Sequence, residues 1–470
     1  MARSRRTDRG RSRTAPAGVG PAAARPVSAG RRWTPARIAL AALGIVGITA
    51  LIINGVIGWN DSRAVVLERE CRRARDAQQW GDEVRLAEAW LRVAPSASKA
   101  LVFLAQGYLG LERKQEAADT LARLPDGDPL TVPSLIERAD LLFGDLRQPH
   151  EAAANCARIL AQRSLSLEAA VEARKRLCFY YAATLQRTRL AEEARLAIEL
   201  GCELPETYIY RIGSDWLTLS NTMSVNSHWL QEAPDDELFL VAAARGYVSN
   251  KGLEEDVAGD AEATGNAEAA GDGKAPPVQE HDRRLAELLE RFPGNLELLA
   301  YFLQKATTKG DIDRVAELLA QSPPEAENDN RFWRFKGWVH TQQGEGDLAA
   351  AAYRRALVHN PYDFSTQHQF AGVLRKEGNL PEAARLAALA AKGRALRKMI
   401  LELPDVRSIP PEVQTELEDY ARGCGDGLTA DRIASRRRLA AASGEEKSPR
   451  TNPLTGTVRT KPLTPVEERN

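Results

Sequence analysis

The sequence has no excess of charge of either sign, because 64 lysines and arginines balance 64 aspartates and glutamates among 470 residues. A chain without a net positive field gains little from the phosphate backbone, so this balance argues against nucleic acid as a partner. The charge is uneven locally. Residues 1–37 hold ten arginines against a single acid, and residues 254–280 hold eight acids against one lysine. We predict that neither stretch folds.

Cysteine is scarce and scattered. No two cysteines form a CxxC pair, and their number is odd, so neither a disulfide framework nor a cysteine zinc site is expected. A lone cysteine on an apolar helix face usually packs as a small hydrophobic side chain. The pair worth testing for a bridge is Cys178 with Cys202. The five positions are Cys71, Cys156, Cys178, Cys202 and Cys424.

The sequence also lacks the common motifs of catalysis and cofactor binding. Its six histidines form no HExxH pair, and no GxxxxGK[ST], GxGxxG or GxSxG segment occurs. Acid pairs such as Glu254 and Glu255 are expected to be solvated charge. We therefore expect no enzyme activity, no metal, no cofactor and no small-molecule substrate.

One long hydrophobic run is present, at residues 38–59. Its 22 residues carry no formal charge, and as a helix they would span about 33 Å, enough to cross a bilayer. Trp33 and Trp59 flank the run where indole rings favour the interface. We predict a single N-terminal transmembrane helix. A cleaved signal peptide and a helix of a soluble protein are the alternatives.

The charge pattern gives an expected orientation for this helix. The basic leader, residues 1–37, is expected to stay in the cytoplasm, with the rest of the chain on the outer side. The Ala/Arg-rich composition suggests a bacterium, so the expected location is the inner membrane, with the C-terminal body on the periplasmic side.

A regular spacing of turn residues runs through the chain. Gly310, Gly344 and Gly378 lie 34 residues apart, and so do Pro95 and Pro129. Between these marks, small and apolar residues recur as pairs of amphipathic helices. An ordinary helical bundle would not be expected to repeat its glycines and prolines at one spacing.

The clearest unit, residues 330–363, reads NRFWRFKGWVHTQQGEGDLAAAAYRRALVHNPYD. It resembles the signature of the tetratricopeptide repeat (TPR) family, in which two helices form a hairpin. Small residues let the helices approach closely, an aromatic residue fills the adjacent gap, and proline ends the unit. The residues that carry the resemblance are Trp333, Gly337, Gly344, Ala349, Tyr353, Ala356 and Pro361.

The resemblance implies an all-α fold, an α-solenoid of TPR helical hairpins that follows the transmembrane helix. The units in phase with this pattern are expected at residues 64–131 and 296–397. Between them we predict degenerate helical repeats at 132–235 and a helical hairpin at 236–292 with a disordered acidic insert at 252–280. A C-terminal helical cap is expected at 398–441 and a disordered tail at 442–470.

In TPR proteins the first helices of successive hairpins line a groove that binds a segment of a partner. The resemblance therefore implies a basic groove with one large aromatic residue, suited to an acidic or carboxylate-bearing segment. The alternative is an ordinary solvated face, and the acidic insert could itself compete for the groove. The groove residues expected by phase are Arg331, Arg334, Trp338, Gln342, His368, Arg375 and Lys376.

The function expected from these features is that of a membrane-anchored scaffold or adaptor, whose partners are other proteins or peptide segments. Two alternatives stay open. One is an envelope chaperone or quality-control factor that holds unfolded clients, and the other is an accessory subunit of a membrane enzyme.

Overall fold

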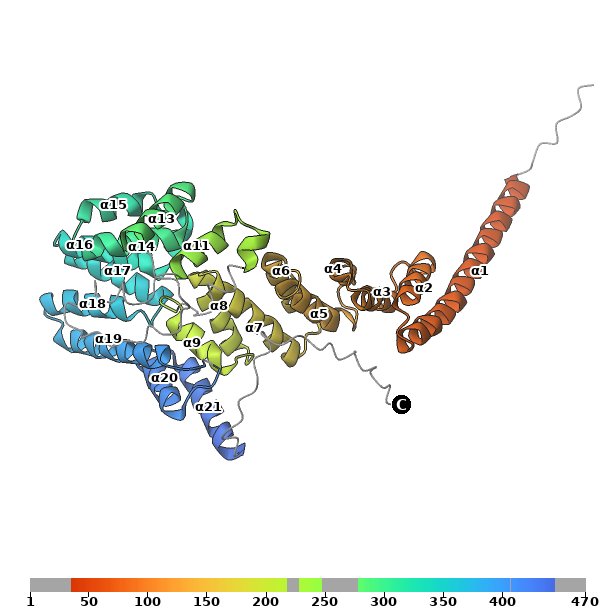
Figure 1. Ribbon diagram of the computed structural model, residues 1–470. Helices are drawn as coiled ribbons and strands as arrows, with labels where there is room; N and C mark the ends of the chain where they lie inside the picture. Colours follow the sequence, from red (N-terminus) through yellow and green to blue (C-terminus); the bar gives the residue numbers. More distant parts are fainter. Residues whose placement is uncertain (1–34, 218–227, 247–277, 406, 444–470) are drawn as a thin grey trace, which may run out of the picture. The chain divides into compact units, whose positions relative to one another are not determined.

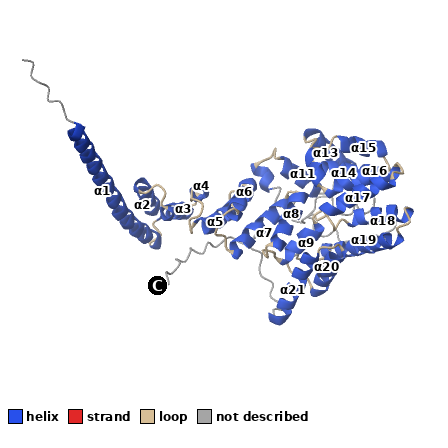
Figure 2. Cartoon of the chain, turned by 180° about the vertical axis from the view of Figure 1, so that it is seen from behind, coloured by secondary structure: helices blue, strands red, loops and turns tan. Residues whose placement is uncertain are grey.

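The computed structural model describes residues 35–217, 228–246, 278–405 and 407–443. Every regular element within these residues is a helix, and Figure 2 shows no strand among them. The predicted all-α fold class is therefore confirmed. The chain divides into two units, residues 1–63 and 64–470. The predicted leader, insert and tail (1–37, 252–280 and 442–470) lie almost entirely outside the described residues.

The predicted transmembrane helix falls within α1, which runs from Pro35 to Asp76. Among the described residues, no helix combines the length and the apolar character that crossing a membrane requires. The helix does not stop at Trp59 but continues through charged residues such as Asp61, Arg63 and Glu68. The predicted membrane span at 38–59 is therefore wrong. So is the predicted single-pass inner-membrane location with a cytoplasmic N-terminus and periplasmic repeats.

From residue 64 onward the chain forms helical hairpins, each packed against the next (Figure 1). The end of α1 contributes Leu67 and Cys71 to a core with Ala87 and Trp90 of α2 and Leu104 of α3. The following helices have these bounds: α2 Trp80–Val93, α3 Ser98–Gly110, α4 Lys114–Ala122, α5 Thr131–Phe143, α6 Pro149–Leu160, α7 Leu167–Ala183, α8 Arg187–Glu199 and α9 Pro205–Gly213.

The remaining helices continue the hairpins toward the C-terminus. Packing is most extensive between α16 and α17 and between α18 and α19, the two units in which the repeat pattern of the sequence agrees best. Their bounds are α11 Glu237–Gly246, α13 Val278–Arg291, α14 Leu296–Thr308, α15 Ile312–Ala320, the 3₁₀ turn η1 Pro324–Asn328, α16 Asn330–Gln342, α17 Gly346–His359, α18 Phe364–Lys376, α19 Leu380–Leu401, α20 Pro411–Gly423 and α21 Gly427–Ser443.

The turn inside each hairpin requires a left-handed backbone conformation. Gly310, Gly344 and Gly378 adopt it with φ of 72°, 78° and 86°. Gln78 and Glu112, which are separated by the same interval as these glycines, take the same conformation with φ of 56° and 58°. This conformation costs a non-glycine residue about 1–2 kcal/mol. The repeat period thus continues in the N-terminal backbone, where no glycine marks it in the sequence.

Close helix packing explains the small residue at position 337. A Cβ atom on Gly337 would lie 2.7 Å from Cε1 of Tyr353, so the ring of Tyr353 occupies the space that a side chain would need. Tyr353 is itself only 1% exposed and packs on Phe370 of the next hairpin. The glycine and the aromatic residue of the repeat signature therefore form one packing unit.

Helix α9 differs from the other helices because eight of its nine residues are buried. A helix with one apolar stripe has an exposed face, whereas α9 is covered on all sides. Its Tyr208, Ile209 and Ile212 share a core with Leu417 of α20 and Ile433 of α21. The middle of the chain thus packs against the C-terminal helices, beyond its neighbours in sequence.

Candidate partner-binding site

The seven groove residues predicted from the sequence lie on two helices that pack directly on each other. Helix α16 carries the first four and α18 carries the other three. We call this surface the α16–α18 face. The part of the face near the N-terminal end of α16 is covered by other segments of the chain, and we call it the N-terminal part. The part toward the C-terminal ends of both helices is exposed, and we call it the C-terminal part.

Arg331 lies in the N-terminal part of the face and is buried. Its guanidinium pairs with Asp329 at 2.8 Å and with Glu297 of α14 at 2.6 Å. These acids hold the pKa of Arg331 well above its ordinary value, although burial by itself opposes the charged form. Arg331 is therefore not the free cation that the repeat phase suggested.

Arg334, one turn later, is also buried. Its Nη1 donates to Oδ2 of Asp363 at 2.6 Å. Asn330 donates to the same carboxylate at 2.9 Å and to Oδ2 of Asp215 at 2.7 Å. The solvent-facing groove expected around Arg331 and Arg334 is thus occupied by the chain's own acidic groups.

The residues that fill this part of the face follow α9 directly. Arg187, at the start of α8, donates from Nη1 to the carbonyl of Ser214 at 3.1 Å and pairs through Nη2 with Glu297 at 3.2 Å. Trp216 lies beneath Arg397 of α19, whose guanidinium carbon is 5.7 Å from the ring centroid. Burial of α9 therefore holds residues 214–217 against the N-terminal part of the α16–α18 face.

Glu297 is the centre of this buried group of charges. Burial raises its pKa, but Arg187, Arg331 and Arg245 outweigh that effect and hold the pKa far below its ordinary value. The carboxylate is therefore ionised, and it balances guanidinium groups from α8, α11 and α16. Removing one member of such a buried group leaves a buried charge without a partner, and this lowers the stability of the fold.

The C-terminal part of the face is open. Trp338 is half-buried and packs at the edge of the core of α14 to α16, whereas Gln342 is exposed. His368, Arg375 and Lys376 are exposed on α18. Five of the seven predicted residues are therefore accessible, Trp338 in part and the other four more fully.

A further cation joins this open part from the second helix of the hairpin. Nη2 of Arg394 on α19 lies 3.5 Å from Nδ1 of His368. Partial burial, and then the charges of Arg394 and Arg375, lower the pKa of His368. We call His368, Arg375, Lys376 and Arg394 the cationic edge. Repeat phase did not indicate Arg394, because it assigns only the first helix of each hairpin to the groove.

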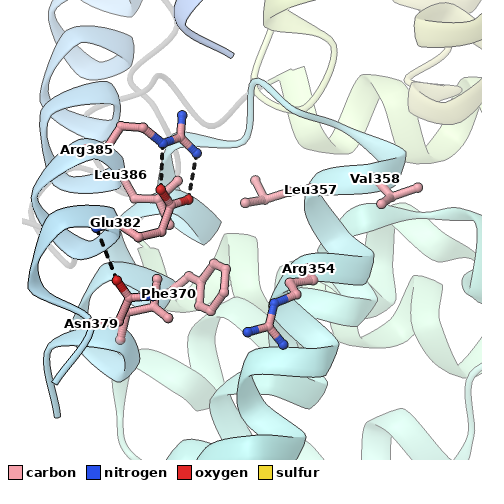
Figure 3. Close-up of a pocket in the computed structure, with 9 residues that line it drawn as sticks. Arg354, Leu357, Val358, Phe370, Asn379, Glu382, Arg385 and Leu386 are labelled. Atoms are coloured by element: carbon pink, nitrogen blue, oxygen red, sulfur yellow. Dashed lines mark hydrogen bonds and ion pairs between the residues drawn. The ribbon is translucent and has the colours of Figure 1, made fainter. Parts of the chain in front are cut away.

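The same hairpins also form a pocket. It has a volume of about 550 Å³ and opens between α17, α18 and α19 (Figure 3). We call it the outer pocket. No sequence signal indicated it, because its walls come from three helices in two repeats. Its lining residues are Arg354, Leu357, Val358, Phe370, Leu374, Asn379, Glu382, Arg385 and Leu386.

The described residues offer no cluster of three or more histidine, cysteine or acidic side chains suited to a metal ion. All five cysteines are free, including Cys178 and Cys202. Burial raises the pKa of the Cys156 thiol to about 12, which disfavours the reactive thiolate. Cys71, Cys156 and Cys178 lie within hydrophobic cores and pack as apolar side chains.

The hairpins, their left-handed turns and the close contact of Gly337 with Tyr353 define an α-solenoid. The regular spacing of its turns makes this solenoid a tetratricopeptide-repeat fold. No family model matches the chain, and no curated protein matches it.

Solved structures of several repeat proteins are similar to this chain. One is a tetratricopeptide repeat protein from Parabacteroides merdae, with 13% identity, covering 67% of this chain and 99% of the other, at a TM-score of 0.24. The APC/C hetero-tetramer Cut9–Hcn1 gives 11% identity, 81% and 87% coverage and a TM-score of 0.31. Yeast Tom70 gives 10% identity, 82% and 96% coverage and a TM-score of 0.26. The assignment of the fold rests on the hairpins of the chain itself.

Proposed function

We propose that the chain is a protein-interaction scaffold whose cationic edge binds an acidic segment of a partner protein. The observation that carries this proposal is the lack of acidic partners at the edge. Within the described part of the chain, none of His368, Arg375, Lys376 and Arg394 forms an ion pair with a carboxylate. Nearby arginines on the same face, such as Arg331 and Arg334, are each paired and buried.

The lowered pKa of His368 also supports an acidic ligand at the cationic edge. Two arginines act on this imidazole, and no carboxylate is among the causes of its shift. Like charges held together without an anion raise the free energy of the site, and an added carboxylate would lower it. Guanidinium groups are suited to carboxylates because they donate two parallel hydrogen bonds. Trp338 and Gln342 lie on the neighbouring helix, where they would contact an apolar or polar part of the same segment.

The test uses a fluorescein-labelled polyglutamate peptide and the full chain, with binding followed by fluorescence anisotropy. Arg375→Glu together with Arg394→Glu should weaken binding at low salt by about tenfold or more, and added salt should weaken binding to the unaltered chain. The matched control is Arg123→Glu with Arg355→Glu, which changes the net charge equally at exposed positions elsewhere. Circular dichroism would establish that each variant is folded.

Two outcomes would contradict the proposal. Equal weakening by the control pair would show a general effect of net charge and no site at the edge. Equally tight binding of an uncharged apolar peptide would favour a chaperone that holds unfolded clients. Arg334 is not a suitable position for this test, because it is buried and paired with Asp363, so charge reversal there would disturb the fold.

A further inference from the structure

The outer pocket has an apolar floor and one unpaired cation at its edge. Phe370, Leu374 and Leu386 are buried at the bottom, and Leu357 forms part of the wall. Val358 is 75% exposed, so an aliphatic side chain borders water at this pocket. A volume of about 550 Å³ falls within the range of about 300–1,000 Å³ typical of ligand pockets.

The charges around the pocket are unequal. On α19, Glu382 accepts two hydrogen bonds from Arg385, each 2.8 Å long, so these two side chains neutralise each other. On α17, Arg354 lies across the pocket from this pair (Figure 3), with its guanidinium carbon 5.4 Å from the ring centroid of Phe370. Arg354 has no acidic partner among the described residues. The rim therefore carries one net positive charge beside an apolar floor.

We propose that the outer pocket binds an apolar side chain of a partner protein segment that carries a carboxylate nearby, with Arg354 as the partner of that carboxylate. The apolar side chain would enter the pocket beside Leu357 and Val358, above Phe370, Leu374 and Leu386, and its own removal from water would provide most of the affinity. The carboxylate would pair with Arg354 in a partly desolvated position, which provides specificity. This site is separate from the cationic edge and does not depend on it.

The positive charge at the rim indicates that the segment bound in the pocket comes from a different protein and not from a second copy of this chain. A second copy that placed its own pocket against this one would bring two Arg354 side chains together, and like charges oppose such a pairing. An acidic and apolar segment of another protein meets both features of the pocket.

The experiment compares two labelled helical peptides that share leucines at i and i+4 and differ only in a neighbouring glutamate or lysine. We expect the folded chain to bind the glutamate peptide about fivefold more tightly than the lysine peptide. Arg354→Glu should reverse this preference. Val358→Arg should weaken the binding of both peptides by at least about tenfold, because it places a charge beside the apolar floor.

Matched variants separate this site from the cationic edge. Arg355→Glu changes the adjacent residue, whose guanidinium lies over the ring of Trp333, and should leave the preference unchanged. Arg375→Glu should also leave the preference unchanged. The experiment can therefore contradict the proposal for the pocket independently of the proposal for the cationic edge. No preference between the peptides, or a preference that Arg354→Glu does not alter, would overturn the proposal. Self-association that Val358→Arg abolishes would overturn it in favour of a second copy.

Discussion

Asp215 and Asp363 share one hydrogen-bond donor, because Nδ2 of Asn330 lies 2.7 Å from Oδ2 of the first and 2.9 Å from Oδ2 of the second. Their sequence positions are far apart, yet both carboxylates accept a hydrogen bond from the same side-chain amide. Arg334 pairs with Asp363 and not with Asp215. The two acids therefore differ in how well their negative charge is balanced.

Replacing Asp215 by asparagine should stabilise the fold at neutral pH. Burial, and then the charge of Asp363, raise the pKa of Asp215 to about 6 against the opposing effects of Arg334 and Arg331. A carboxyl group whose pKa is higher in the folded state favours folding at low pH, and this contribution is lost as the pH rises from about 4 to about 6. Above that range the ionised group costs up to about 2–3 kcal/mol.

Urea unfolding of the chain and of Asp215→Asn at several pH values would measure this effect. The variant should be more stable at pH 7, and its advantage should shrink below pH 6, because the unaltered carboxyl becomes protonated. An advantage that grows on acidification would contradict the assigned direction of the pKa shift.

Glu297→Gln should destabilise the fold strongly. The substitution removes the anion that pairs with Arg187 and Arg245 and leaves these buried guanidinium groups uncompensated, whereas Arg331 keeps Asp329. A loss of about 3–5 kcal/mol is expected. Glu290→Gln is the control, since Glu290 is an exposed glutamate of α13, and it should change the free energy of unfolding by less than about 0.5 kcal/mol.

An acidic peptide at the cationic edge should raise the pKa of His368. The free imidazole has a lowered pKa because of partial burial and the neighbouring Arg394 and Arg375, and a bound carboxylate opposes these effects. Because protonated His368 binds an anion better, affinity should increase as the pH falls. An upward shift of one pKa unit on binding corresponds to about tenfold tighter binding at low pH.

Nuclear magnetic resonance of the His368 ring, with and without the polyglutamate peptide, would measure this shift directly. His368→Gln should remove most of the pH dependence of binding. If the variant keeps the pH dependence, another group is responsible and His368 is not part of the site.

Two glycine-to-alanine substitutions should have opposite effects on the stability of the fold. Gly337→Ala brings a methyl group against the ring of Tyr353 and should cost about 1–3 kcal/mol. Gly372→Ala, also inside a helix, meets nothing within 4 Å and should stabilise the chain by about 0.5–1 kcal/mol. Thermal unfolding of the two variants would test both expectations, and similar losses at both positions would show that tight packing is not the reason for glycine at 337.

The repeat pattern of the sequence predicted local packing well because that packing is made within one unit or between neighbours. Gly337 and Tyr353 lie on the two helices of one hairpin, and their types alone indicate their contact. The positions of Trp338 and His368 on adjoining helices follow from the same phase. The hairpin turn at Glu112 was not indicated, because the backbone there is left-handed without a glycine.

The part of the site that could not be predicted depends on residues far away in the sequence. Repeat phase places Arg331 and Arg334 on a groove, but it contains no information on what covers them. Arg187 lies 110 residues before its partner Glu297, and Asp215 lies 115 residues before Asn330. A pattern that repeats within each hairpin cannot reveal contacts at such separations. The membrane span predicted from the hydrophobic run at 38–59 is contradicted, because no helix of the described residues is long and apolar enough to cross a membrane.

The burial of α9 also affects how the chain folds. In an ordinary repeat array each hairpin touches only its neighbours, so stability is close to a sum of local contributions and folding can begin anywhere. Here Tyr208 and Ile212 share a core with Leu417 and Tyr420, which come much later in the sequence. Such contacts require a long loop to close, which slows folding and joins distant repeats in one cooperative transition. Cutting the chain between α15 and α16 would therefore give two fragments with incomplete cores instead of two shorter arrays.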